Sequence, residues 1–168
     1  MCGCPCYTTI MYAGVDIGGT KVLAAVLDEN GVITEQVKFP TPPDYQEFLK
    51  VLADTVAGFK TREFRAAGVG MPVTSFDRHE GRGLTYGNLP WRDVPIQHDL
   101  EQLLRCPVAL ENDAKLGALS EYMLLKDQFH KVLYITVSTG IGIGLVEDGV
   151  IDPNVGDSGG KIMYIEHE

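Results

Sequence analysis

Three short segments of this 168-residue chain combine residue types that could handle a phosphate group. The first is the run at residues 16–21, Asp-Ile-Gly-Gly-Thr-Lys, and the second is the glycine-rich run at residues 138–144. Glycine lets a backbone approach an anion closely, so such turns can aim N–H groups at phosphate oxygens. Between them, Glu111, Asn112 and Asp113 place carboxylates and an amide at an expected helix start. The combination indicates chemistry rather than binding alone.

Each segment also has an ordinary structural interpretation. Gly18 and Gly19 can form a tight hairpin turn that binds no ligand. Asn112 or Asp113 can act simply as a helix N-cap, a role worth about 1 kcal/mol. Capping and catalysis are compatible, and the order of the motifs favours a catalytic role for Asp113.

Composition narrows the class of function. With 45% hydrophobic and 22% charged residues, the chain is long enough for one well-buried domain, or for one domain and part of another. A formal net charge of −9 argues against non-specific binding to nucleic acid or anionic membranes, and small-molecule partners fit better. No apolar run approaches the roughly 20 residues of a membrane span. The first basic residue is Lys21, so a secretory signal is not expected and we predict a cytoplasmic protein.

The cysteines do not predict a disulfide framework. Cys2, Cys4 and Cys6 crowd into the first six residues, and Cys106 stands alone. The cluster could hold a soft metal ion, but its spacing is not that of a standard zinc site. The simpler interpretation is a disordered extension over residues 1–10.

Hydrophobic patterns predict the elements that position these residues. Three antiparallel strands are expected first, at residues 11–15, 22–27 and 32–39, with an Asn-Gly turn at residues 30–31. Apolar residues at helical spacing predict a helix over residues 45–59. The remaining expected elements are a strand at 66–71, a long loop at 72–95, a helix at 99–104, a strand at 108–110, a helix from 112 or 113 to 125, and a hairpin of strands 132–137 and 143–146 closed by a turn at Thr139 and Gly140. These crossovers imply a mixed sheet.

Taken in order, the motifs resemble those of the ROK family of sugar kinases, which belongs to the actin-like ATPase superfamily. The matching features are the glycine turn at 16–21, Asn-Leu-Pro-Trp at 88–91, Glu-Asn-Asp-Ala at 111–114 and Thr-Gly-Ile-Gly at 139–142. The resemblance implies an α/β fold with a ribonuclease H-like mixed sheet and flanking helices over residues 11–127. Residues 128–168 would begin a second domain of similar core, here truncated.

The resemblance also implies ATP-dependent phosphorylation of a hexose or hexose derivative, with Mg²⁺. Two loops would grip the nucleotide from opposite sides of a cleft, with the side chain of Asp113 between them. The implied nucleotide-binding residues are Gly18, Gly19, Thr20 and Lys21 in the first loop and Thr139, Gly140 and Gly142 in the second. Asp16 would hold the magnesium ion through water, since hard cations prefer oxygen ligands.

Asp113 matches the catalytic base of the family, which takes the proton from the attacking sugar hydroxyl. Asn112 and Asp113 would contact the sugar, together with Gly87, Asn88 and Asp157. The tryptophan that follows this loop, Trp91, fits a core position and a cleft wall equally well.

The chain departs from the family pattern at residues 156–161. Where the family has Gly-Glu-x-Gly-His, this chain has Asp157 in place of the glutamate and Gly160 in place of the histidine, and the usual cysteine-rich zinc site does not follow. The identity of the sugar therefore stays open. Since the resemblance covers only the opening of the second domain, a fragment of a longer kinase and a shortened gene product both fit, and the isolated chain need not be active.

Other functions are compatible with the same motifs. A catalytically silent module that binds sugar or regulates is the main alternative, and another actin-like ATPase, such as an acetate kinase or a chaperone, is a third. A DNA-binding repressor of the same family is disfavoured because only 15 residues precede Asp16. The apolar second hairpin predicts self-association, such as a homodimer.

Overall fold

The computed structural model describes residues 10–137 and 141–156 of the chain. The chain forms two compact units. The first takes in the residues up to 69 and residues 96–109, and the second takes in residues 70–95 and the residues from 110 onward. The predicted domain boundary between residues 127 and 128 stays a prediction. Residues 1–9, with Cys2, Cys4 and Cys6, lie outside the described residues.

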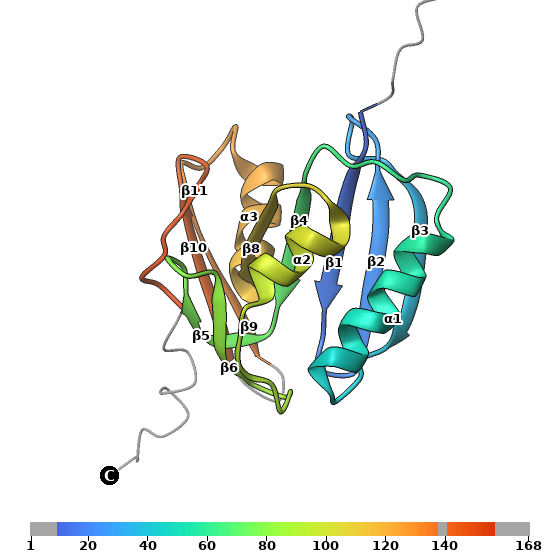
Figure 1. The fold of residues 1–168 in the computed structure, drawn as a ribbon. Helices are drawn as coiled ribbons and strands as arrows, with labels where there is room; N and C mark the ends of the chain where they lie inside the picture. Colours follow the sequence, from blue (N-terminus) through green and yellow to red (C-terminus); the bar gives the residue numbers. More distant parts are fainter. Residues whose placement is uncertain (1–9, 138–140, 157–168) are drawn as a thin grey trace, which may run out of the picture. The chain divides into compact units, whose positions relative to one another are not determined.

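The chain opens with the predicted antiparallel strands, which belong to a five-stranded sheet of order β3-β2-β1-β4-β8 (Figure 1). The bounds of its strands are β1 Tyr12–Ile17, β2 Lys21–Leu27, β3 Ile33–Pro40, β4 Ala67–Met71 and β8 Val108–Asn112. The turn between β2 and β3 forms as predicted, because Gly31 adopts a positive φ of 77° and the Asp28 side chain accepts hydrogen bonds from the N–H groups of Asn30 and Val32.

Alternation along β1 and β2 separates the faces of this sheet. The buried side comprises Ala13, Val15, Ile17, Val22, Ala24 and Val26. Asp16 and Lys21 lie on the other side and are exposed. Two helices complete the first unit, α1 (Tyr45–Gly58) and α2 (Ile96–Leu104). Asp44 caps α1 by accepting a hydrogen bond from the Glu47 N–H group, and the Tyr45 hydroxyl donates to Asp99 of α2 at 2.9 Å.

In the second unit, the prediction of a loop over residues 72–95 is wrong. This segment forms a three-stranded antiparallel sheet of β5 (Val73–Asp77), β6 (Arg82–Tyr86) and β7 (Arg92–Val94). The strands are short, and shifts in register interrupt the β5–β6 pairing, so the sequence lacks a regular two-residue alternation. Trp91 is only 3% exposed and packs edge-on against Tyr86, which makes it a core residue.

Helix α3 (Asp113–Leu125) packs on a second three-stranded sheet, formed by β9 (Lys131–Val137), β10 (Ile141–Glu147) and the short β11 (Val150–Ile151). Ala118 and Tyr122 of α3 form a buried cluster with Val146 of β10. The glycines of β10 make this packing possible. A Cβ atom on Gly144 would lie 2.7 Å from the carbonyl oxygen of Ala114, and one on Gly142 would lie 2.8 Å from the Ala114 Cβ atom.

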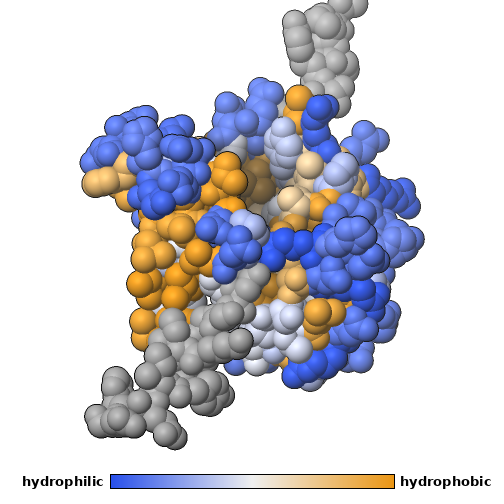
Figure 2. Space-filling view, turned by 90° about the vertical axis from the view of Figure 1, so that its left-hand side faces the viewer, coloured by the Kyte–Doolittle hydropathy of each residue, from blue (hydrophilic) through white to orange (hydrophobic). Residues whose placement is uncertain are grey.

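The opposite face of β9 is apolar and exposed. Leu133, Ile135 and Val137 are 58%, 56% and 74% exposed, and they alternate with half-buried residues that face α3. Figure 2 shows a broad hydrophobic surface on the side where β9 and β10 lie. The predicted self-association remains a prediction. Among the described helices, none is long and apolar enough to cross a membrane.

Candidate functional site

The turn between β1 and β2 is held in one shape by its own backbone and by Thr41. The Gly18 N–H group donates to the Lys21 carbonyl at 2.9 Å. A Cβ atom on Gly18 would lie 2.9 Å from that same oxygen, so only glycine fits there. Thr41 donates its hydroxyl to the Gly18 carbonyl at 2.7 Å and its N–H group to the Thr20 carbonyl at 3.1 Å. No sequence pattern indicates this role for Thr41.

This turn leaves backbone donors for a ligand. Within the described part of the chain, the N–H groups of Gly19 and Thr20 take part in no hydrogen bond, whereas that of Gly18 is used inside the turn. Gly19 is partly exposed, and Thr20 and Lys21 are exposed. Two free N–H groups beside an ammonium group can bind an anion such as phosphate.

A hollow lies beside the turn on the same face of the sheet. Asp16 is opposite Leu23, and Leu23 is opposite Lys38, so these three side chains project from one face of neighbouring strands. The hollow has a volume of about 180 Å³ and is lined by Asp16, Lys21, Val22, Leu23 and Lys38. In the described residues the Asp16 carboxylate has no ion-pair partner, so its oxygens can accept hydrogen bonds from water bound to a hard cation. No group of three or more histidine, cysteine, aspartate or glutamate side chains that could hold a metal ion gathers in the described residues.

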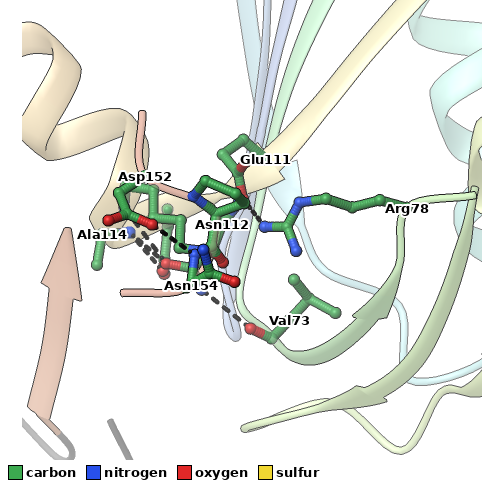
Figure 3. A network of polar contacts seen from close by, with 10 residues as sticks. Val73, Arg78, Glu111, Asn112, Ala114, Asp152 and Asn154 are labelled. Atoms are coloured by element: carbon green, nitrogen blue, oxygen red, sulfur yellow. Dashed lines mark hydrogen bonds and ion pairs between the residues drawn. The ribbon is translucent and has the colours of Figure 1, made fainter. Parts of the chain in front are cut away.

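Asn112 is the N-cap of α3, so the ordinary interpretation of this residue is confirmed. Its side-chain oxygen accepts hydrogen bonds from the N–H groups of Ala114 and Lys115, and its Nδ2 atom donates to the Val73 carbonyl at 2.9 Å (Figure 3). An amide has two acceptor sites and two N–H donors. One N–H donor is therefore left for a sugar hydroxyl.

Asp113 follows as the first residue of α3. One carboxylate oxygen accepts a hydrogen bond from the Ala114 N–H group at 2.8 Å, while the residue as a whole is exposed. The partial positive charge of a helix N-terminus favours a negative group at this position. Asp113 is thus an accessible carboxylate on a fixed helix start.

The other predicted sugar contacts in the described residues belong to the same unit. Gly87 and Asn88 are exposed in the turn after β6. The Gly87 N–H group donates to the Pro72 carbonyl at 3.0 Å, and the next carbonyl, that of Val73, accepts from Asn112. Residues 72–73 therefore connect the turn after β6 with the start of α3.

An ion pair also fixes the approach to α3. Arg78 donates to Glu111 at 2.8 Å, and the same carboxylate oxygen accepts a hydrogen bond from the Asn112 N–H group. The guanidinium carbon of Arg78 lies 5.4 Å from the centre of the Phe76 ring. No sequence signal could identify this pair, because its members are 33 residues apart and lie in different elements.

Lys115 is a further residue that sequence reasoning missed. It is fully buried, and its Nζ atom donates to the Pro153 carbonyl at 2.8 Å. A signal was present, since Lys115 lies three and seven residues before Ala118 and Tyr122 and therefore falls on the buried stripe of the helix.

Three predicted site residues, Thr139, Gly140 and Asp157, lie outside the described residues. Gly142 packs closely against α3, so a side chain at this position would clash with the helix. The predicted contact of Gly142 with the nucleotide stays a prediction. The predicted cleft involves residues of both units, and it too stays a prediction.

Comparison with known proteins identifies relatives over most of the chain. The profile of the ROK family matches residues 12–160. The glucokinase of Streptomyces coelicolor is 36% identical over 135 residues, which are 79% of this chain and 42% of that protein. An N-acetylmannosamine kinase of Salmonella newport is 32% identical over 159 residues, 89% of this chain and 52% of that protein.

A solved structure confirms the predicted fold class. The ROK family glucokinase from Streptomyces griseus, in complex with glucose and AMPPNP, superposes with a TM-score of 0.74 at 34% identity. The superposition covers 88% of this chain and 47% of that one. The chain therefore spans about half the length of the relatives that it matches.

Proposed function

Because this chain belongs to the ROK family, we propose that it acts in the phosphorylation of a hydroxyl group on a hexose or hexose derivative, with ATP as donor. The observation that carries the proposal is the exposed carboxylate of Asp113 at a capped helix start. Relatives that are a glucokinase and an N-acetylmannosamine kinase support this reaction class, as does the glucose and AMPPNP complex of the similar structure. A cytoplasmic location is part of the proposal.

Asp113 acts as the general base. Its carboxylate accepts the proton of the sugar hydroxyl while that oxygen attacks the terminal phosphorus atom of ATP. A bond forms between the sugar oxygen and phosphorus, and the bond from phosphorus to the oxygen of ADP breaks. The remaining N–H group of Asn112 donates to the sugar, and Gly87, Asn88 and Asp157 supply further contacts in this proposal.

The phosphate groups are bound by the turn at residues 18–21. The N–H groups of Gly19 and Thr20, which bond to no other described residue, donate to phosphate oxygens, and the Lys21 ammonium group offsets the charge of the phosphate. Thr139, Gly140 and Gly142 would contact the nucleotide from the second glycine segment. Asp16 would hold Mg²⁺ through water, and the cation, when bound, offsets charge on the transferred phosphoryl group.

The test is a coupled assay of ADP formation over a panel of hexoses and N-acetylated hexosamines. We expect Asp113→Asn to lower turnover by roughly 10²- to 10⁴-fold, the usual contribution of a general base. Asp127→Asn is the matched control, because Asp127 is an exposed carboxylate just beyond the other end of α3. Turnover that survives Asp113→Asn would remove the proposed base. Calorimetry that finds sugar binding without nucleotide binding would instead support the silent module.

A further inference from the structure

Lys115 is the one charged side chain that is fully buried in the described residues. Lysine is almost never buried to this extent without partners, because its ammonium group loses the hydration it has in water. The Nζ atom donates to the Pro153 carbonyl at 2.8 Å, across 38 residues of sequence. The contact therefore ties the first turn of α3 to the segment that follows β11.

That segment, residues 152–156, lies against β10 and α3. The Asp152 N–H group donates to the Leu145 carbonyl at 2.9 Å, and the Asp152 side chain accepts a hydrogen bond from the Asn154 N–H group. Figure 3 shows Asp152 and Asn154 beside Asn112 and Ala114 at the start of the helix.

Gly156, at the end of this segment, packs against both Ile143 of β10 and the side chain of Lys115. It adopts a φ of 101°, and a Cβ atom there would lie 2.0 Å from the Ile143 carbonyl oxygen and 3.4 Å from the Cε atom of Lys115. The end of the segment thus passes close to both β10 and the lysine stem. Any side chain at Gly156 would push the segment away.

Stability does not explain why a lysine occupies this position. Burial of its ammonium group costs free energy, whereas an apolar side chain of similar length fills the same space without that cost. The acceptor belongs to Pro153, which is exposed, so its carbonyl can bind water if the lysine is removed. The hydrogen bond from the lysine to the Pro153 carbonyl, which an apolar side chain cannot make, sets where the segment lies.

We propose that Lys115 is a positioning residue of the sugar site. It holds residues 152–156 against the first turn of α3, the turn that begins at Asn112 and Asp113. The inference rests on the proposed function, since it assigns the segment to the binding of the sugar.

The test compares Lys115→Met with Lys126→Met, which removes an exposed lysine just beyond the other end of α3. Hydrogen exchange is followed by NMR at the Asp152 and Asn154 amides, the two that donate hydrogen bonds in this segment. Sugar binding is measured by calorimetry with glucose, mannose and N-acetylmannosamine, and stability by urea unfolding. In Lys115→Met we expect exchange to accelerate and sugar affinity to fall, each by roughly threefold to tenfold as for one hydrogen bond. The urea concentration at the unfolding midpoint of Lys115→Met should stay the same or rise. Lys126→Met should change none of the three.

The outcomes separate the inference from the proposed function. Unchanged sugar affinity in Lys115→Met, in a chain that binds sugar, overturns the inference alone. A fall in the unfolding midpoint that accounts for the weaker binding shows a merely structural role and also overturns it. If the unaltered chain binds none of the sugars, the proposed function fails for this chain and the inference fails with it.

Discussion

The amide of Asn112 makes two kinds of contact at once, and substitution can separate them. Its oxygen caps α3, a role worth about 1 kcal/mol, and its Nδ2 atom donates to the Val73 carbonyl, a hydrogen bond also worth about 1 kcal/mol. Asn112→Ala removes both and should lower the free energy of unfolding by about 2 kcal/mol. Asn112→Ser keeps a capping oxygen and loses the donor to Val73, so about 1 kcal/mol is expected.

The measurement is urea unfolding followed by the fluorescence of Trp91. This is the single tryptophan of the chain, it is 3% exposed, and it belongs to the same compact unit as Asn112. For a slope of about 1–2 kcal/mol/M, Asn112→Ala should move the midpoint down by about 1–2 M and Asn112→Ser by about half as much. Ser120→Ala, on the exposed side of α3, is the control and should change stability by less than about 0.5 kcal/mol.

Two results would refute this reasoning. Equal losses for Asn112→Ala and Asn112→Ser would show that the capping oxygen contributes nothing. An alanine variant as stable as the unaltered chain would show that neither contact matters. In that case Asp113 would not stand on the fixed helix start that the proposed mechanism requires.

Three further predictions test the packing of the chain. Gly144→Ala should destabilise it by roughly 1–3 kcal/mol in urea unfolding, because the new Cβ atom would meet α3 at 2.7–2.8 Å, while Gly68→Ala, with open space around it, should not. Ile135→Lys should reduce the binding of a hydrophobic dye with little loss of stability, since Ile135 is 56% exposed; unchanged dye fluorescence would contradict this. Burial and Glu101 raise the pKa of the Cys106 thiol, so alkylation located by mass spectrometry should be slow at pH 8 and quicken on unfolding. Because the folded state holds that proton more tightly, stability should fall as the pH rises above the ordinary thiol pKa.

Sequence patterns predicted the parts of the fold that local rules determine. Strands β1 and β2 were predicted within a few residues of their observed bounds, because they are apolar and meet at the glycine turn. Helix α1 was predicted equally well, because its apolar residues repeat at helical spacing. The β5–β7 sheet was missed because its strands are short and its register shifts break the alternation. Helix α2 begins at Ile96 rather than 99, directly after Pro95, which has no N–H group to donate.

In the candidate site, too, some residues could be predicted from sequence motifs and others could not. Asp113 and Asn112 could be named from the motif, and the cap was a foreseen alternative. Their supports could not be named, since the Val73 carbonyl and the Arg78 side chain meet them only through the fold. Lys115 is intermediate, because its place on the buried stripe was readable but its acceptor, Pro153, was not.

The two glycine motifs look alike in sequence, but in the described residues their glycines have different structural roles. In β10, Gly142 and Gly144 lie in strand pairs, and added Cβ atoms would strike α3, so these glycines are explained by close packing. In the turn after β1, a Cβ atom on Gly18 would strike only the turn itself, and the N–H groups of Gly19 and Thr20 remain unbonded in the described residues. Free backbone donors, rather than glycine content, are what a phosphate group needs. The phosphate-binding proposal therefore rests mainly on the first motif, the turn at residues 18–21. Alanine at Gly142 should chiefly weaken the fold.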